Sequence, residues 1–77
     1  MTVTVYTREG CMQCKATIRM FQSKGVDPHI VDITDNDSAR DRLVEQGYTQ
    51  LPVVTCDGDE WSGYRPDLIL TATQKAQ

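Results

Sequence analysis

The chain has 77 residues, of which 39% are hydrophobic and 25% are charged, and its net charge is −3. This length and composition predict one small globular domain spanning residues 1–77, with the last few residues frayed. The acidic balance argues against nucleic acid or an anionic membrane as a partner. No apolar run approaches membrane-spanning length, and residues 1–10 lack the pattern of a signal peptide, so we expect a cytoplasmic protein.

Two strands and two helices are predicted in the first part of the chain. Residues 3–6 alternate and are β-branched, which is typical of a strand. A helix is predicted over residues 12–24, because good helix formers run from the cysteine motif to a stop at Gly25. A second strand over residues 29–33 follows, and then a polar helix over residues 39–46 with capping residues before it.

A hairpin and a last helix are predicted in the second part. The strands cover residues 51–56 and 60–62 around an Asp-Gly turn, and a helix covers residues 68–73 after Pro66. The order β-α-β-α-β-β-α predicts an α/β protein, a four-stranded mixed sheet with helices on its faces. The candidate core residues are Met20, Phe21, Leu43, Val44, Val53, Leu68 and Leu70.

Two cysteines separated by two residues, Cys11 and Cys14, lie where the first helix begins. Cβ atoms three residues apart on a helix are about 5–6 Å apart, so the two sulfurs can bond with little adjustment. Cys11 precedes the helix, where unpaired backbone N–H groups and the dipole favour an anion, so we expect its pKa below that of a free thiol. Cys14, one turn further on, should be less exposed. We therefore predict that Cys11 attacks a disulfide and Cys14 resolves the product.

Other meanings of the cysteine pair are a zinc site, a copper-carrying module and chance. A zinc site needs two further ligands, and only Cys56 and His29 remain, each alone on a predicted strand. Copper-carrying domains also place a Cys-x-x-Cys at their first helix, but they run β-α-β-β-α-β. A metal-carrying binding module stays open as the alternative from a different class. Three cysteines with one close pair fit a cytoplasmic protein better than a secreted scaffold.

The strand over residues 51–56 has a proline, Pro52, near its start. Proline cannot donate to a strand ladder, so it marks an edge, a bulge or a cis bond. The motif and the topology favour a cis bond here. Such a bond would turn the backbone N–H and C=O of Leu51 outward beside Cys11, toward an extended partner chain. The ordinary alternative is a trans proline that only opens the strand.

The cysteine pair, the strand-opening proline and the order of elements resemble the thioredoxin superfamily in its short glutaredoxin-like form. Within it, CMQC and the Trp-Ser-Gly-Tyr-Arg-Pro-Asp stretch at residues 61–67 are similar to the NrdH-redoxin family. That family's pattern is Cys-[Val/Met]-Gln-Cys with Trp-Ser-Gly-Phe-Arg-Pro-Asp, so Tyr64 in place of phenylalanine is the one departure. The resemblance covers nearly the whole chain.

The resemblance implies a thioredoxin fold and a monomeric dithiol–disulfide oxidoreductase that behaves as a thioredoxin. It implies that electrons come from NADPH through thioredoxin reductase and pass to class Ib ribonucleotide reductase. No bound cofactor is expected, because the electrons sit in the sulfurs. The implied catalytic pair is Cys11 and Cys14, and the implied partner-binding residues are Met12, Gln13, Leu51, Pro52, Trp61, Ser62, Gly63, Tyr64 and Arg65.

Two stretches distinguish this chain from glutathione-dependent relatives. Those proteins usually carry Gly-Gly-x-x-Asp and a Thr-Val pair before the proline, where this chain has Ser-Gly-Tyr-Arg and Gln-Leu. Glutathione is therefore expected to be a poor reductant, and a glutathione-dependent glutaredoxin is the nearest alternative. The ring of Trp61 fits either a docking anchor or a core-covering aromatic. Arg65 is expected to pair with Asp67 or with a carboxylate elsewhere.

Overall fold

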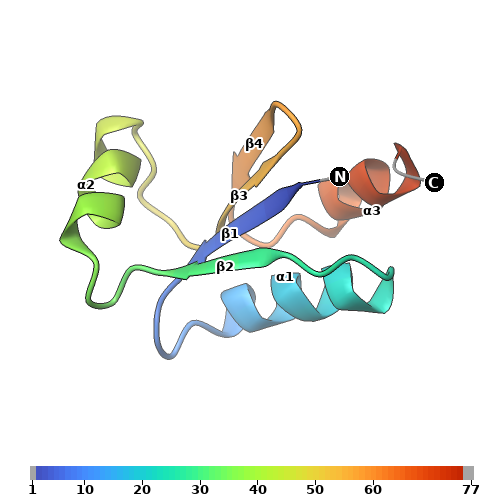
Figure 1. Ribbon diagram of the computed structural model, residues 1–77, viewed down its shortest axis with the longest axis horizontal. Coiled ribbons are helices and arrows are strands. Elements are labelled where there is room, and N and C mark those ends of the chain that lie inside the picture. Colours follow the sequence, from blue (N-terminus) through green and yellow to red (C-terminus); the bar gives the residue numbers. More distant parts are fainter. Residues whose placement is uncertain (1, 76–77) are drawn as a thin grey trace.

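The structure is a computed structural model that describes residues 2–75. Its elements follow the predicted order β-α-β-α-β-β-α (Figure 1). Their bounds are β1 Val3–Thr7, α1 Met12–Ser23, β2 His29–Asp32, α2 Asp37–Glu45, β3 Val53–Cys56, β4 Asp59–Ser62 and α3 Pro66–Lys75. Fraying is expected for the last few residues; α3 extends to Lys75, and residues 76–77 lie outside the described part.

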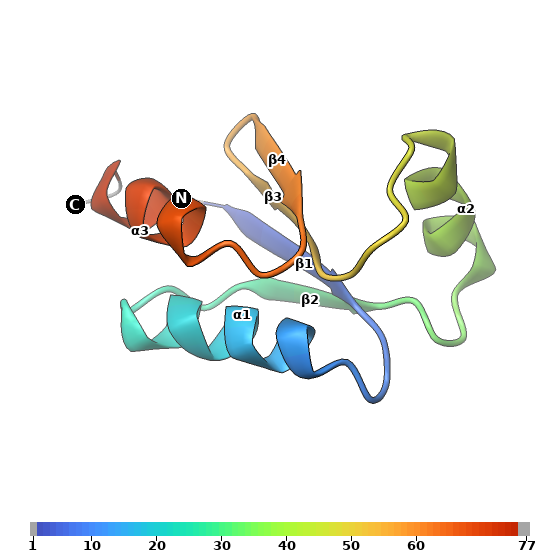
Figure 2. The ribbon, with the colours of Figure 1, turned by 180° about the vertical axis from the view of Figure 1, so that it is seen from behind.

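The four strands form one mixed sheet in the order β2-β1-β3-β4 (Figure 2). β1 and β2 are parallel and are connected through α1, whereas β3 is antiparallel to both β1 and β4. The predicted mixed sheet flanked by three helices is confirmed. Tyr6 pairs with Val53 at the end of the β1–β3 ladder. The chain therefore leaves β1 and enters β3 at the same end of these two central strands.

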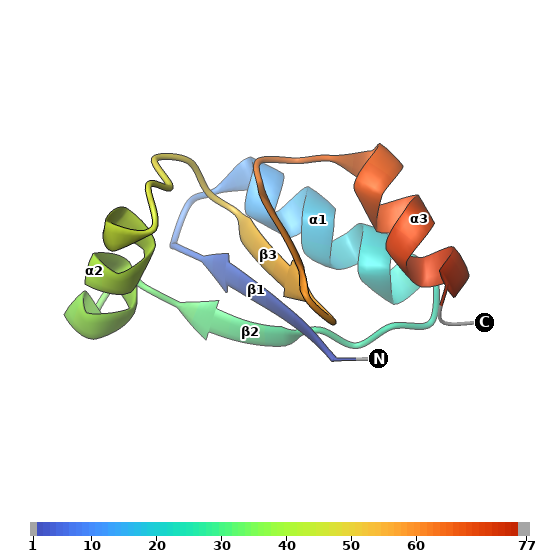
Figure 3. The same ribbon diagram turned by 90° about the horizontal axis from the view of Figure 1, so that it is seen from above.

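One face of the sheet is covered by α1 and α3, which lie side by side over it (Figure 3). Side chains alternate between the two faces of a strand, and Val5 and Val54 point to this face. They join Phe21 of α1 and Ile69 of α3 in the larger core cluster, and all four are fully buried. This cluster anchors the helix that carries the cysteines.

The opposite face carries a smaller core cluster beneath α2. Val53, the strand neighbour of Val54, turns to this side and packs with Ile33 and with Leu43 of α2. Tyr6 and Leu51 are partly buried against them. Figure 3 shows α2 well apart from α1 and α3. The loop after α2 leads into β3 at the end of the sheet that lies near the cysteines.

Local capping explains where α2 begins and where α1 ends. Asn36 caps α2, because its side-chain oxygen accepts a hydrogen bond from the N–H of Ala39 at 3.1 Å. α2 therefore begins at Asp37, two residues earlier than predicted. Gly25 follows α1 with a φ of +78°, a left-handed conformation that ends a helix at low cost only for glycine.

The core prediction is wrong for Val44 and Leu70, which are 64% and 36% exposed. A helix turns about 100° per residue, so the burial of Leu43 and Ile69 directs their successors toward solvent. Periodicity in short helices did not distinguish these neighbours. The other predicted core residues are buried or partly buried: Met20, Phe21, Leu43, Val53 and Leu68.

Thr17 provides a test of the packing between α1 and the sheet. Its side chain is fully buried, and its Oγ1 finds no hydrogen-bond partner among residues 2–75. Thr17→Val keeps the side-chain shape and removes the unpaired oxygen, so the free energy of unfolding should rise by about 1 kcal/mol. Urea denaturation followed by circular dichroism measures this change. Thr73→Val is the matched control and should give no gain, because the buried Thr73 hydroxyl donates to the Ile69 carbonyl at 2.9 Å. Equal gains at both positions would contradict the assignment.

Candidate active site

Cys11 occupies the N-cap of α1. Its backbone is extended, and its Sγ accepts a hydrogen bond from the N–H of Cys14 at 3.2 Å. The turn before it passes through Gly10, whose φ is +80°. An atom at this place satisfies an otherwise unpaired N–H of the first helical turn and meets the positive end of the helix dipole. Whether this position stabilises a thiolate in the reduced protein stays a prediction.

Cys11 and Cys14 form a disulfide, with their Cα atoms 5.2 Å apart. The two residues differ in access: Cys14 is fully buried, whereas Cys11 is half-buried at the surface. Thiol–disulfide exchange requires that the attacking and attacked sulfurs meet. A sulfur on another molecule can therefore reach Cys11 but not Cys14.

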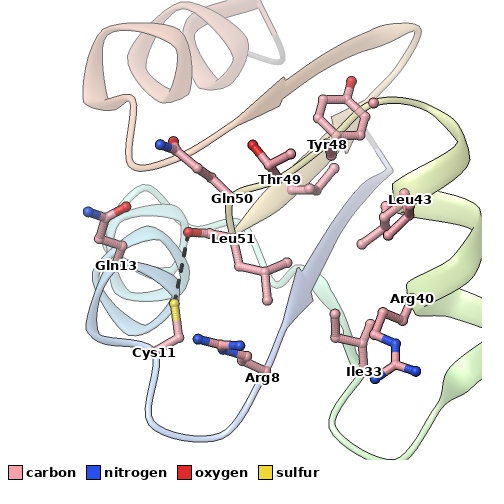
Figure 4. A pocket seen from close by; sticks show the side chains of 13 residues that line it. Arg8, Cys11, Gln13, Ile33, Arg40, Leu43, Tyr48, Thr49, Gln50 and Leu51 are labelled. Atoms are coloured by element: carbon pink, nitrogen blue, oxygen red, sulfur yellow. Dashed lines mark hydrogen bonds between the residues drawn. The ribbon is translucent and has the colours of Figure 1, made fainter.

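The segment before β3 lies against Cys11. The Leu51–Pro52 peptide bond is cis, which confirms the conformation that the sequence favours. The carbonyl oxygen of Leu51 lies 4.0 Å from Sγ of Cys11, which is 40 positions away in the sequence (Figure 4). Pro52 is fully buried, and its carbonyl accepts a hydrogen bond from the N–H of Gly63 at 2.8 Å. The strand-opening proline therefore joins the cysteine turn to the segment after β4.

The segment from Trp61 to Tyr64 closes this side of the site. Trp61 is only 7% exposed and belongs to the larger core cluster, so the structure places it as a core-covering aromatic. Gly63 has a φ of +84°, and a Cβ there would meet the side chain of Gln50 at 3.4 Å. Tyr64 is 41% exposed, and its hydroxyl donates to Sδ of Met20 at 3.7 Å. Tyr64, and not Trp61, presents a ring to solvent here.

Arg65 and Asp67 form the expected ion pair, with Nε–Oδ1 and Nη2–Oδ2 distances of 3.2 and 3.1 Å. The hydrogen bonds from Arg65 lower the pKa of Asp67, and the same contacts raise the pKa of Arg65. Both side chains are exposed, so the pair contributes little to stability. It holds the guanidinium of Arg65 back against the first turn of α3. Ser62, at the end of β4, is half-buried beside this segment.

A surface cavity of about 580 Å³ opens beside Cys11, between the start of α1 and α2 (Figure 4). Of the predicted site residues, Cys11, Gln13 and Leu51 line it. Met12 is not among the lining residues and is 75% exposed. The structure therefore brings one set of predicted residues together at this cavity and another set at the segment after β4.

Sequence reasoning missed five polar residues of the cavity lining, Arg8, Arg40, Tyr48, Thr49 and Gln50. Arg8 stands three positions before Cys11, a proximity that is a usable signal. Arg40 and Tyr48 reach the cavity only through the placement of α2 and the loop after it. The Tyr48 hydroxyl donates a hydrogen bond to the Glu60 carboxylate, which raises the pKa of Tyr48 and ties the loop to β4.

The remaining candidate ligands lie apart from one another. His29 is exposed on the edge strand β2, and Cys56 is buried at the end of β3. Within residues 2–75, no three or more His, Cys, Asp or Glu side chains come together so that they could hold a metal ion. None of the helices in that part of the chain has the length and apolar character to cross a membrane.

Comparisons with known proteins show which proteins the chain is similar to. A family model described as Glutaredoxin matches residues 3–61. The chain is 45% identical over 69 residues to the glutaredoxin-like protein NrdH of Salmonella typhimurium, covering 90% of this chain and 85% of that protein. It is 42% identical to Escherichia coli NrdH over the same shares.

The chain is also similar to a solved structure of such a protein. The NrdH-redoxin of Escherichia coli, a glutaredoxin-like protein with a thioredoxin-like activity profile, superimposes with a TM-score of 0.89 at 41% identity. The match covers 92% of this chain and 93% of that one. A glutaredoxin from Archaeoglobus fulgidus, with a TM-score of 0.75 and 24% identity, shares the fold.

The ion pair after β4 gives a prediction on titration. The pKa of Asp67 is lowered from the ordinary value of an aspartate because Arg65 donates hydrogen bonds to its carboxylate. A carboxyl whose pKa is depressed by folding adds stability above its unfolded pKa, and that stability is lost as the pH falls through the folded pKa. An NMR titration of the Asp67 carboxyl carbon should give a midpoint below that of an ordinary aspartate, and Arg65→Gln should move it upward.

The control for this titration is Asp32 in the same protein. Its pKa is lowered by hydrogen bonds from Thr34, not by Arg65, so its midpoint should stay unchanged in the Arg65→Gln variant. An Asp67 midpoint that does not move in that variant would show that the pair does not persist in solution.

Proposed function

The chain belongs to the glutaredoxin family and, within it, to the NrdH glutaredoxin-like proteins, and from this membership we propose that it donates electrons to class Ib ribonucleotide reductase after reduction by NADPH-dependent thioredoxin reductase. It is a thiol–disulfide oxidoreductase with a thioredoxin fold. The observation that carries the proposal is the identity to NrdH proteins over nine tenths of the chain. The thioredoxin-like activity profile of its Escherichia coli relative supports thioredoxin reductase as the electron donor.

The reaction begins with Cys11. Its thiolate, stabilised by the N–H of Cys14, attacks one sulfur of the partner disulfide. The partner's S–S bond breaks, its second sulfur leaves as a thiolate and takes up a proton, and a mixed disulfide joins Cys11 to the partner. Cys11 is the attacking residue in this proposal because its sulfur is the accessible one.

Cys14 completes the exchange. Its thiol loses a proton and attacks Sγ of Cys11, where the N-cap hydrogen bond already brings the two residues together. The mixed disulfide breaks, and the partner's first sulfur leaves as a thiolate and is protonated. Two electrons have then moved from the Cys11–Cys14 dithiol to the partner. A reductase dithiol reverses these steps on the oxidised chain.

Leu51 is the proposed docking point for an extended partner chain. Its backbone N–H donates no hydrogen bond within residues 2–75, and its carbonyl oxygen faces Cys11. Pairing of the partner's backbone with Leu51 would hold the partner's sulfur beside Cys11. Met12, Gln13 and the exposed ring of Tyr64 complete the proposed contact surface, and Trp61 supports it from below.

We propose a cytoplasmic monomer that needs no bound cofactor, because the reducing equivalents are held by the cysteine pair. The alternative is a glutathione-dependent glutaredoxin. The stretches around Leu51 and Gly63 argue against it, since they lack the residues that glutathione-using relatives carry there.

The electron donor is tested by coupled assays with insulin as the disulfide substrate. With NADPH and thioredoxin reductase, the protein should sustain rapid consumption of NADPH. With glutathione, glutathione reductase and NADPH, the rate should stay near the background measured without the protein. Efficient turnover with the glutathione system but not with thioredoxin reductase would establish the glutaredoxin alternative. Tight stoichiometric copper or zinc binding without insulin reduction would instead establish a metal carrier.

The roles of the two cysteines are tested by trapping. Cys14→Ser should accumulate a mixed disulfide with ribonucleotide reductase, visible on non-reducing gels, because no thiol resolves it. Cys11→Ser should form none, because the buried Cys14 cannot reach the partner. Cys56→Ala, which leaves the pair intact, is the matched control and should behave as the parent chain. Trapping by Cys11→Ser alone would reverse the assignment.

A further inference from the structure

The cavity beside Cys11 has a basic lining although the chain as a whole is acidic, with a net charge of −3. Among the described residues, the charged side chains that line it are Arg8 and Arg40, and no aspartate or glutamate does. A cleft lined by charges of one sign attracts ligands of the opposite sign and speeds their encounter. The reactive sulfur therefore borders a positive site on an otherwise negative protein.

Both guanidinium groups are available to a ligand. Figure 4 shows Arg8 beside Cys11 and Arg40 toward α2. Arg8 is exposed and forms no ion pair within residues 2–75. Arg40 is paired with Asp37 at 3.3 Å, but these side chains are 57% and 82% exposed. Such a pair is weak, so a ligand carboxylate can compete for Arg40.

An adjacent hollow lies between the same two arginines. It is also lined by Glu9, which makes that hollow less favourable for an anion. The Cys11 side, where no carboxylate of the chain enters the lining, is the better place for a ligand carboxylate.

Part of the remaining lining is apolar, which narrows the class of ligand. Leu43 and Val44 of α2 and Leu51 line it, and Val44 is 64% exposed. An apolar residue of a ligand would remove this surface from water. Glutathione supplies carboxylates but no apolar side chain. A protein segment supplies both.

We propose that this cavity binds an extended acidic segment of a protein partner, the segment that carries the partner's disulfide. The segment places a cysteine at Cys11, an apolar side chain against Val44 and Leu51, and an aspartate or glutamate at Arg8 and Arg40. This inference rests on the proposed function and specifies which disulfides the carrier prefers. The electron balance is that of the exchange above: the segment's disulfide becomes two thiols while Cys11 and Cys14 become a disulfide.

Two synthetic peptides test the preference. Each contains one internal disulfide and the same apolar residues, and they differ only in glutamate or glutamine pairs that flank the cysteines. The reduced protein should reduce the glutamate peptide about fivefold faster at low ionic strength. The advantage should shrink at about 1 M salt, where charges are screened within about 3 Å. Each rate is divided by the rate with dithiothreitol, which corrects for differences between the peptide disulfides.

Substitutions of the arginines test which residues of the protein cause the faster reduction of the glutamate peptide. Arg8→Gln and Arg40→Gln should each reduce the advantage of the glutamate peptide, and the double variant should abolish it. Arg42→Gln is the matched control, because Arg42 is an exposed arginine of α2 outside the cavity lining, and it should keep the full advantage. Thermal unfolding of each variant establishes that it is folded.

The outcomes separate this inference from the function on which it rests. Equal rates for the two peptides would overturn the acidic segment and leave the dithiol chemistry intact. Failure to reduce either peptide would overturn the proposed function, and the inference with it. Rapid reduction of the oxidised protein by glutathione that is lost in Arg8→Gln would assign the arginines to a small thiol, which also overturns the inference.

Discussion

The hydrogen bond from the N–H of Cys14 to Sγ of Cys11 is the contact on which the site depends. The sulfur that caps α1 is also the attacking atom of the proposed exchange, so the chemistry takes place at the start of the helix. α1 is held on the sheet by a buried face at Cys14, Thr17 and Phe21, which are spaced three and four residues apart. A displacement of α1 would therefore move the sulfur, its N–H donor and the resolving cysteine together.

The sheet brings the second half of the site to that point. β1 leads into the cysteine turn and pairs with β3, so the Tyr6–Val53 pairing sets Leu51 beside Cys11. The N–H of Gly63 then ties Pro52 to the segment after β4. The larger core cluster lies under α1 and α3, whereas the cavity opens toward α2, where Leu43 and Leu51 belong both to the lining and to the smaller hydrophobic cluster.

Much of this could be predicted from the sequence, because the signals are local. The cysteine spacing, the glycine stops and the alternating strands determine the order of elements without knowledge of packing. The cis bond before Pro52 could be predicted from the cysteine motif and the order of elements. Trp61 could not be assigned, since the size of its ring suits a core and a docking surface equally well. The cavity could not be predicted either, because Arg40 reaches it only through the way α2 is turned over the sheet.

The burial of Cys14 has a kinetic consequence for a carrier of this kind. In the proposed exchange, a mixed disulfide at Cys11 is resolved by a thiol of the same chain, so this route to release of the partner is a first-order step. Because Cys14 is buried, its thiol is kept from other disulfides in solution and can act on Sγ of Cys11. The geometry of the carrier's own fold thus sets the lifetime of the covalent complex along this route.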